Sequence, residues 1–128
     1  MLSRVAFIDD DINLLESITW IFQEEPYEVY VFQDPVNAIK TLKNNEFALV
    51  IIDQMLPIFF GTDLIYEIKN INPKTEIIIM ASNPYTAREN NLEYEMIIKP
   101  WDIDELKEIV SRKVDSYNMK NQETNKTC

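Results

Sequence analysis

The chain has no histidine, one cysteine and one glycine among its 128 residues, and its 22 acidic residues outnumber 12 basic ones. Without histidine, the sequence lacks the commonest metal ligand and general base, and it excludes any nucleophile triad built on an imidazole. The lone Cys128 cannot form a disulfide within the chain. The formal net charge of −10 argues against direct binding to nucleic acid, because phosphate backbones attract basic surfaces.

Long apolar runs are missing as well. No run approaches the roughly 20 residues that a membrane-spanning helix needs. Residues 1–11 do not form a signal peptide, because their short apolar run ends in three acids. We therefore expect a cytoplasmic protein that does not contact the membrane. With 46% apolar and 11% aromatic residues, the length suits one globular domain with a single core.

Strand-like and helical segments alternate along the chain. Short apolar runs predict strands at residues 4–8, 28–32, 47–52, 76–81 and 94–98. The third and fourth runs are continuously apolar, as is typical of strands covered on both faces. The segments between the strands have apolar residues at helical spacing. Strands that alternate with helices predict an α/β fold, a parallel sheet with helices on both faces.

Capping residues mark several helix starts. Asp11 is placed to cap the first helix, and Asp34 followed by Pro35 predicts a helix that ends near Lys43. Asp102 is expected to cap the last helix. We expect one domain over residues 1–117. Residues 118–128 have no apolar periodicity, and we expect a frayed polar tail or the start of a linker there.

Polar residues directly follow four of the predicted strands. Asp9 and Asp10 follow the first, Asp53 the third, Ser82 the fourth and Lys99 the fifth. Ligands of open parallel sheets bind at the carboxyl ends of the strands. Each residue taken singly has an ordinary structural explanation as a cap or a solvated loop group. Together, we expect them to form one site at this edge of the sheet.

This residue set suits the transfer of a phosphoryl group onto a carboxylate. Carboxylates that lie about 4 Å apart repel each other by roughly 4 kcal/mol at an effective dielectric near 20, and a divalent cation removes this penalty. Oxygen ligands without histidine or thiolate favour a hard cation, and Mg²⁺ also pairs with phosphate. The ammonium of Lys99 and the hydroxyl of Ser82 can then neutralise or hydrogen-bond the oxygens of the transferred group.

Four stretches, VAFIDDD, IIDQMLPIFFG, IIIMASN and IIKPWDIDEL, resemble the receiver domain of bacterial two-component response regulators, the CheY-like family. The resemblance covers about residues 4–117. Gly61, the only glycine, lies eight residues after Asp53, where the family places one. The resemblance implies a flavodoxin-like, doubly wound, five-stranded parallel sheet of order 2-1-3-4-5. It also implies a signalling domain that catalyses only its own phosphoryl transfer and a slow loss of the phosphoryl group.

By the same resemblance, Asp53 is the phosphoacceptor. Asp9 and Asp10 correspond to the metal-binding acid pair, with Asp10 as the more direct ligand. The main-chain carbonyl of Met55 corresponds to the third protein contact of a Mg²⁺ or Mn²⁺ ion. The implied partner is a sensor histidine kinase or a phosphotransfer protein. The family also suggests a homodimer through the face formed by the fourth helix, fifth strand and fifth helix.

The resemblance extends to the switch residues. Ser82 stands for the switch hydroxyl, and Lys99 for the lysine that precedes a cis bond to Pro100. The family has an aromatic residue three positions before that lysine, where this chain has Met96, and Tyr94 lies two positions earlier. The stretch from Ser82 to Lys99 is about five residues shorter than in the family, so we expect a short or unravelled fourth helix.

Two further residues are expected to set the lifetime of the phosphorylated state. In receivers, the positions two after the acceptor and two after the switch hydroxyl face the path of the hydrolytic water, and here they are Met55 and Pro84. Neither side chain is polar, so neither can orient the water. We therefore expect a long-lived phosphoryl group, which suits a slow output such as a change in gene expression.

Two other interpretations remain open at this point. The first is a receiver-like interaction module whose switch is locked, because Met96 replaces the aromatic residue. The second is a small phosphatase of the haloacid dehalogenase type, because Asp9 to Asp11 also contains an Asp-x-Asp motif after a strand. In that case Asp9 carries the phosphate and Asp53 does not. Asn13 stands where that family prefers a hydroxyl or a small apolar residue.

Overall fold

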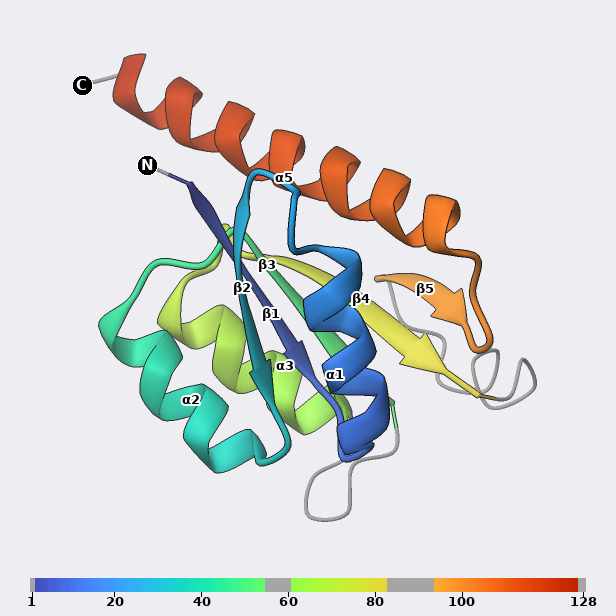
Figure 1. The fold of residues 1–128 in the computed structure, drawn as a ribbon. Coiled ribbons are helices and arrows are strands. Elements are labelled where there is room, and N and C mark those ends of the chain that lie inside the picture. The colour runs from blue at the N-terminus through green and yellow to red at the C-terminus, as the bar shows by residue number, and fades with distance from the viewer. Residues whose placement is uncertain (1, 55–60, 83–93, 127–128) are drawn as a thin grey trace.

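The apolar runs form one five-stranded sheet in the computed structural model, which describes residues 2–54, 61–82 and 94–126 (Figure 1). Along the chain, the elements are β1 (Ser3–Ile8), α1 (Ile12–Ile21), β2 (Tyr27–Phe32), α2 (Pro35–Asn44), β3 (Leu49–Asp53), α3 (Gly61–Ile71), β4 (Glu76–Ala81), β5 (Glu95–Ile98) and α5 (Ile103–Lys126). Each predicted strand is therefore present, within a residue or two of the expected ends. The expected short fourth helix lies outside the described residues.

The strands are all parallel and follow the order β2-β1-β3-β4-β5. This confirms the predicted order, in which β1 lies between β2 and β3. Ile8, the last residue of β1, pairs with Ile52 of β3. The polar residues that follow β1 therefore lie beside the end of β3, at the point where the strand order reverses.

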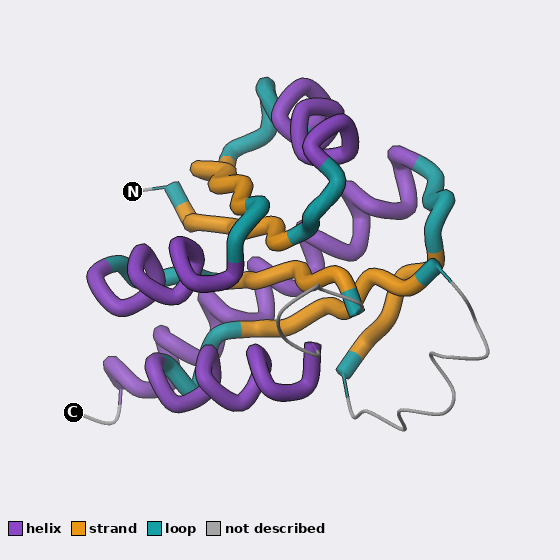
Figure 2. The backbone as a smooth tube through the Cα atoms, turned by 90° about the horizontal axis from the view of Figure 1, so that it is seen from below, coloured by secondary structure: helices purple, strands orange, loops and turns teal. Residues whose placement is uncertain are grey.

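The core consists of two apolar clusters, one on each face of the sheet. Helices lie over both faces (Figure 2). Successive residues of a strand point to opposite faces. Val5 and Phe7 of β1 pack in the cluster that includes residues of α1 and α5. Ala6 and Ile8 pack in the cluster that includes residues of α2 and α3. Every residue of β3 is buried, as expected for a central strand covered on both sides.

Short polar residues fix the helix starts as predicted. Asp11 caps α1 by accepting hydrogen bonds from the main-chain N–H groups of Asn13 and Leu14. Asp34 caps α2 through the N–H of Val36, and Pro35 is the first helical residue. A proline fits this position because the first N–H of a helix has no partner within the helix. These caps fix the direction in which the chain leaves β1 and β2.

The last helix differs from the expectation. α5 continues through residues 118–126, where the lack of apolar periodicity predicted a frayed tail or linker. Polar contacts explain the difference, because Lys120 pairs with Glu76 and Asn121 donates a hydrogen bond to Glu46. The division into a domain over residues 1–117 and a separate tail stays a prediction. Among the described helices, none has the length and apolar character to cross a membrane.

Candidate functional site

Three aspartates meet at the carboxyl edge of the sheet. Asp9 and Asp10 follow β1, and Asp53 is the last residue of β3. One carboxylate oxygen of each lies within 4.8 Å of the others. Asp9 and Asp53 are only 3% and 8% exposed, whereas Asp10 is exposed to solvent. The arrangement is an acidic pocket with two buried carboxylates and one at its mouth.

Local hydrogen bonds hold the acidic turn after β1. The Asp9 N–H donates to the carbonyl of Phe32 at 3.0 Å, and the Asp9 Oδ1 accepts from the N–H of Asp11 at 3.0 Å. Gln33 donates from Nε2 to the carbonyl of Asp10 at 3.3 Å. These contacts hold the main chain on both sides of Asp10. The orientation of the acid pair is therefore set by the main chain and by the end of β2.

Gln33 was missed by the sequence argument. It is the first polar residue after the apolar run of β2, so the strand-end rule that found the other site residues could have found it. The other strand ends carry a charged or hydroxyl group that the predicted chemistry uses. An amide that contacts a main-chain carbonyl has no such signature, because its contribution is to position a neighbour.

Lys99 connects the two buried carboxylates. Its Nζ lies 2.8 Å from Asp9 Oδ2 and 3.9 Å from Asp53 Oδ1. The main-chain N–H of Lys99 donates to the carbonyl of Ala81 at 2.8 Å, and the bond from Lys99 to Pro100 is cis. Both oxygens of Asp9 therefore have a partner, the ammonium on one side and the N–H of Asp11 on the other. A carboxylate this buried requires such pairing.

The donor set of this pocket fits a hard divalent cation. Three carboxylates face one ammonium, so the described side chains leave an excess of two negative charges. All three candidate ligands are oxygen atoms, the type that Mg²⁺ and Mn²⁺ prefer. Asp10 is accessible from solvent and provides an entry for the ion. The cluster of Asp9, Asp10 and Asp53 could therefore hold a metal.

The expected switch residues lie on neighbouring strands. Ser82 directly follows β4 and is exposed. Tyr94 and Met96 are partly buried and pack against the apolar cluster shared with α2 and α3, and Met96 pairs with Ile79 in the sheet. The structure thus places Ser82 at the same edge as the acidic pocket. Met55 and Pro84 lie outside the described residues.

Comparisons with known proteins agree with this geometry. The family model of the response regulator receiver domain matches residues 5–111. The chain is 27% identical to the response regulator ArlR of Staphylococcus saprophyticus over 108 residues, which cover 82% of this chain and 49% of ArlR. It is 24% identical to the regulatory protein AtoC of Escherichia coli over 127 residues, which cover 94% of this chain and 27% of AtoC. The chain spans about half or less of these relatives.

Solved structures share the fold. A CheY-like response regulator receiver domain protein from Methanospirillum hungatei has a TM-score of 0.83 and 25% identity, with 94% of this chain and 99% of that chain covered. A structure described as adenylate cyclase from Rhodopirellula baltica has a TM-score of 0.87 and 21% identity, with 98% and 96% covered. The second likeness concerns the fold alone.

The fold and the acidic pocket define a CheY-like α/β domain with the features of a phosphoacceptor module. The match to the family model extends over residues 5–111, most of the chain. The chain belongs to the response regulator receiver domain family.

Proposed function

We propose that Asp53 accepts a phosphoryl group from the phosphohistidine of a sensor histidine kinase or a phosphotransfer protein, in a reaction that depends on Mg²⁺ or Mn²⁺. The observation that carries this proposal is the pairing of the acidic cluster with Lys99, whose Nζ lies 2.8 Å from Asp9 and 3.9 Å from Asp53. A cationic group beside an acceptor carboxylate is what a transferring phosphoryl group requires. The proposed location is the cytoplasm, as predicted from the sequence.

The proposed transfer is a displacement at phosphorus. An oxygen of the Asp53 carboxylate forms the new P–O bond, and the P–N bond of the donor phosphohistidine breaks. The imidazole nitrogen leaves with the bonding electron pair. Asp53 is the last residue of β3 and lies within 4.8 Å of the other carboxylates, so its position is fixed before the donor arrives. Such preorganisation lowers the entropic cost of the reaction.

The other residues of the pocket offset negative charge. Asp10, Asp9 and Asp53 would hold the divalent cation, which when bound supplies positive charge to the oxygens of the transferred group. The Lys99 ammonium provides a second positive charge. Ser82, which is exposed at the end of β4, would donate its hydroxyl proton to a phosphoryl oxygen. This hydrogen bond is the proposed start of the switch, in which Tyr94 and Met96 respond.

The phosphorylated domain is proposed to change its affinity for a partner. Its relatives ArlR and AtoC are named a response regulator and a regulatory protein, and the chain matches only part of each. A homodimer through the face of β5, α5 and the fourth helix is one proposed readout. The apolar Met55 and Pro84, by the resemblance, are proposed to slow hydrolysis and so favour a slow output.

One observation bears on the phosphatase alternative. That interpretation requires Asp9 as the nucleophile. Both carboxylate oxygens of Asp9 are engaged, by Lys99 at 2.8 Å and by the Asp11 N–H at 3.0 Å. Asp9 is also the least exposed of the three aspartates. These contacts favour Asp9 as a fixed member of the ion site rather than as the attacking group.

Phosphorylation with acetyl phosphate and Mg²⁺ tests the proposal. The wild-type chain should gain one acid-stable, base-labile phosphoryl group, detected by intact mass and mapped by peptide analysis. Asp53→Asn should abolish it, because an amide oxygen cannot replace the carboxylate nucleophile. Asp104→Asn, in the first turn of α5, is the matched control and should be labelled normally. Label that persists in Asp53→Asn and vanishes in Asp9→Asn would instead support the phosphatase.

A further inference from the structure

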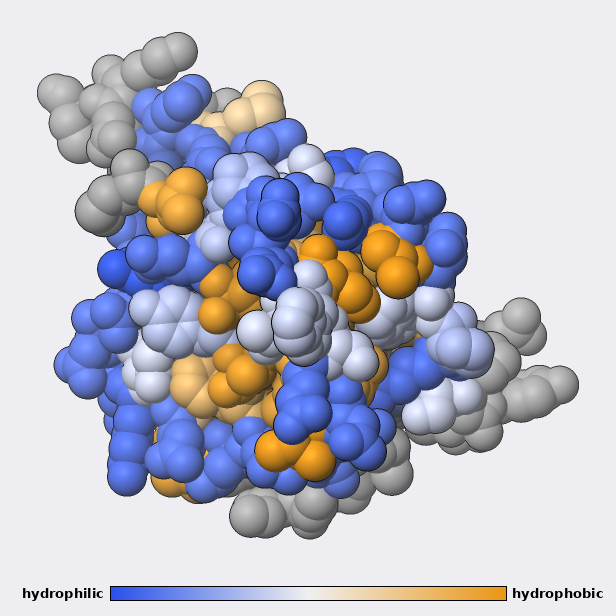
Figure 3. All heavy atoms as spheres, viewed as in Figure 1, coloured by the Kyte–Doolittle hydropathy of each residue, from blue (hydrophilic) through white to orange (hydrophobic). Residues whose placement is uncertain are grey.

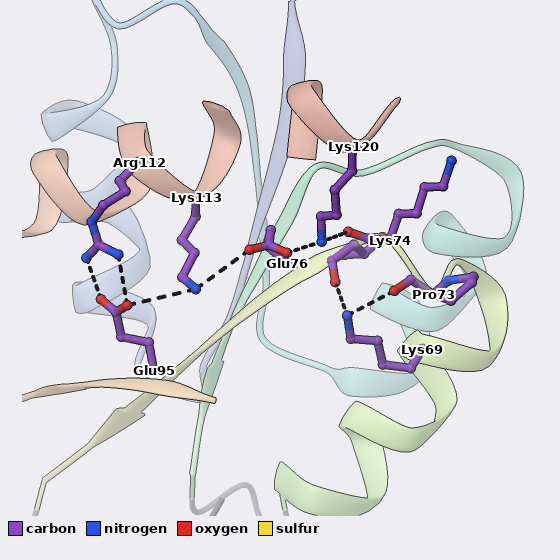
Figure 4. Close-up of polar contacts among 9 residues, drawn as sticks. Lys69, Pro73, Lys74, Glu76, Glu95, Arg112, Lys113 and Lys120 are labelled. Carbon is purple, nitrogen blue, oxygen red and sulfur yellow. Dashed lines mark hydrogen bonds and ion pairs between the residues drawn. The ribbon is translucent and has the colours of Figure 1, made fainter. Parts of the chain in front are cut away.

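The amino end of the sheet carries a second group of charged residues, far from Asp53 along the strands. Glu76 begins β4, and its side chain is only 13% exposed. Its carboxylate forms ion pairs with Lys120, and with Lys113 at 3.6 Å. Figure 4 shows both lysines reaching down from α5 toward this carboxylate. The ion pair with Lys120 connects the sheet to the part of α5 that the sequence did not predict to be helical, and the pair with Lys113 to the part that it did.

A second glutamate contacts the same part of α5. Glu46, just before the buried segment that leads into β3, accepts hydrogen bonds from the hydroxyl of Tyr117 and from Asn121 Nδ2, the latter at 3.1 Å. Asn72 Nδ2 also donates a hydrogen bond to the hydroxyl oxygen of Tyr117 at 3.4 Å. Together with the pair of Lys120 and Glu76, these contacts fasten two successive turns of α5 to the starts of β3 and β4.

Apolar packing does not explain the order of residues 118–126. Among the α5 side chains that the structure describes, up to residue 122, the last buried one is Tyr117. Met119, the only apolar residue in the sequence from 118 to 126, is 63% exposed. The coloured atoms near the C-terminal end of α5 are mostly hydrophilic in Figure 3. Asparagine and threonine, frequent in this segment, are weak helix formers. A short polar helix of this kind is marginal in water without tertiary contacts.

The surroundings of Glu76 are rich in cations. Lys69 donates from Nζ to the carbonyls of Thr75 and Pro73, at 2.6 and 3.1 Å. Burial, followed by the proximity of Lys120, lowers the pKa of Lys69. Figure 4 shows Lys113 and Lys120 of α5 directed at the Glu76 carboxylate, and Lys69 of α3 directed at main-chain carbonyls beside it. Lys113 also pairs with Glu95 at 3.8 Å. Without the negative charge of Glu76, repulsion among the ammonium groups would weaken the docking of the end of α5.

Ionisation of both glutamates is favoured in the docked arrangement. Burial raises the pKa of Glu76, but the hydrogen bond and charge of Lys120, with the charges of Lys113 and Lys69, outweigh it and lower this pKa below its ordinary value of 4.5. A carboxylate with a lowered pKa stabilises the folded state above its unfolded pKa, and this stability is lost as the pH falls through the folded pKa.

The same holds for Glu46. The hydrogen bonds of Tyr117 and Asn121 lower its pKa below the ordinary 4.5, against a smaller opposing effect of burial, and the charges of Arg4 and Lys74 act in the same direction. Burial and the hydrogen bond to Glu46 raise the pKa of Tyr117. The phenol thus remains a donor over the range in which Glu46 is an acceptor.

We propose that Glu46 and Glu76 form a carboxylate anchor, a charge-dependent device that decides whether residues 118–126 are docked as helix or released. With both glutamates ionised, the segment continues α5. When the charges are removed, the segment detaches as a local unit, while the apolar face of α5 up to Tyr117 keeps the rest of the helix in place. Such local opening is common where few apolar contacts hold a helix end.

The proposal is separate from phosphoryl transfer. Glu76 and Ser82 lie at opposite ends of β4, and Glu46 lies before the strand that ends in Asp53. A strand rises about 3.3 Å per residue, so the anchor is remote from the acidic pocket. Variants of the anchor should therefore be labelled by acetyl phosphate like the wild type, and the two proposals can fail independently.

Hydrogen exchange tests the anchor. Amide protection is measured for residues 118–122 and, as an internal reference, for 106–114 at pH 7. The double variant Glu46→Gln, Glu76→Gln should lose about tenfold or more of the protection at 118–122, since hydrogen bonds to charged groups are lost, and should keep it at 106–114. Lys120→Met with Asn121→Ala should do the same from the helix side. Met119→Ala, which directly precedes these two positions and is exposed, is the control and should match the wild type.

Wild-type protection at 118–122 should also fall as the pH is lowered below 4.5, before the reference amides respond, because the pKa values of both glutamates are lowered from 4.5 in the docked arrangement. The proposal is overturned if both double variants keep wild-type protection at 118–122. It is equally overturned if Met119→Ala loses as much protection as they do, because apolar packing of Met119 rather than the anchor would then hold the segment, since alanine does not lower helix propensity. The helix-side variant leaves the sheet unchanged, so it remains informative if the glutamate variant does not fold.

Discussion

The two ends of the parallel sheet both gather charged side chains, but they balance them differently. At the carboxyl end, the carboxylates of Asp9, Asp10 and Asp53 face one described ammonium, that of Lys99. At the amino end, Lys113 and Lys120 of α5 pair with the carboxylate of Glu76, and Lys113 also pairs with Glu95. Excess negative charge at a strand edge costs free energy unless a cation joins it. The carboxyl end, with its excess negative charge, is therefore suited to bind a cation. The amino end, where carboxylates pair with ammonium groups, is suited to hold α5.

The two ends of the sheet also differ in how far apart in sequence the contacting residues lie. The acidic turn has a local contact, the bond from the Asp11 N–H to Asp9, in addition to its contacts with Phe32, Gln33 and Lys99. The anchor joins residues 44 and 75 positions apart, from Lys120 to Glu76 and from Asn121 to Glu46. Local contacts form at a small entropic cost, whereas distant ones depend on the whole sheet being folded. We expect the anchor to open before the acidic turn does.

The largest effect should come from Lys99→Ala. This change leaves the buried Asp9 without its ammonium, and breaking a buried ion pair costs about 3 kcal/mol, less where water reaches the site. Urea unfolding without metal measures the loss. Adding Asp9→Asn should recover part of it, because the unpaired charge is then gone. If the double variant is as unstable as Lys99→Ala, the cost does not arise from the carboxylate.

A smaller effect is expected from acid at the opposite end. Lowering the pH below 4.5 should reduce the free energy of unfolding, since the pKa values of Glu46 and Glu76 are lowered on folding. Glu76→Gln should cost about 1 kcal/mol at pH 7 and should flatten this pH dependence. Glu67→Gln, an exposed glutamate on α3, is the control. If the pH dependence of the unfolding free energy is the same in Glu76→Gln as in the wild type, Glu76 does not contribute to the charge balance at the amino end.

Asp10→Asn should act in the other direction. Without metal it should leave the chain as stable as the wild type or stabilise it by up to about 1 kcal/mol, because a repulsive charge is removed. Added Mg²⁺ should raise the melting temperature of Asp10→Asn less than that of the wild type, because one ligand of the ion is lost. Thermal melting with and without Mg²⁺ measures both effects. Equal shifts for the two proteins would contradict the assigned pocket.

The smallest effect should come from Gln33→Ala. Loss of the 3.3 Å hydrogen bond to the Asp10 carbonyl should weaken Mg²⁺ binding by about twofold, the scale of one exposed hydrogen bond. Calorimetric titration measures the affinity, and the melting temperature without metal should not change. Gln33→Asn is the matched control for polarity, since its shorter side chain keeps the amide but not the reach. If the affinity of Gln33→Ala equals that of the wild type, Gln33 does not position the acid pair.

Much of the fold followed from short-range patterns. The continuously apolar run before Asp53 predicted a central strand, and each residue of β3 is buried. Asp11 and Asp34 predicted helix starts that the structure has. The order of the strands followed from the family resemblance. The meeting of Asp9, Asp10 and Asp53 followed from the rule that strand ends of a parallel sheet share one edge.

The sequence by itself thus determined the strands, the helix caps and the residues at the carboxyl edge, because apolar periodicity and capping depend on nearby residues. Only the tertiary structure decided that Lys99 lies closer to Asp9 than to Asp53, and that Gln33 holds the Asp10 peptide. Only it made residues 118–126 part of α5, since Glu46 and Glu76 supply a docking surface that no local pattern encodes. Polar contacts between distant residues depend on geometry that the folded sheet provides.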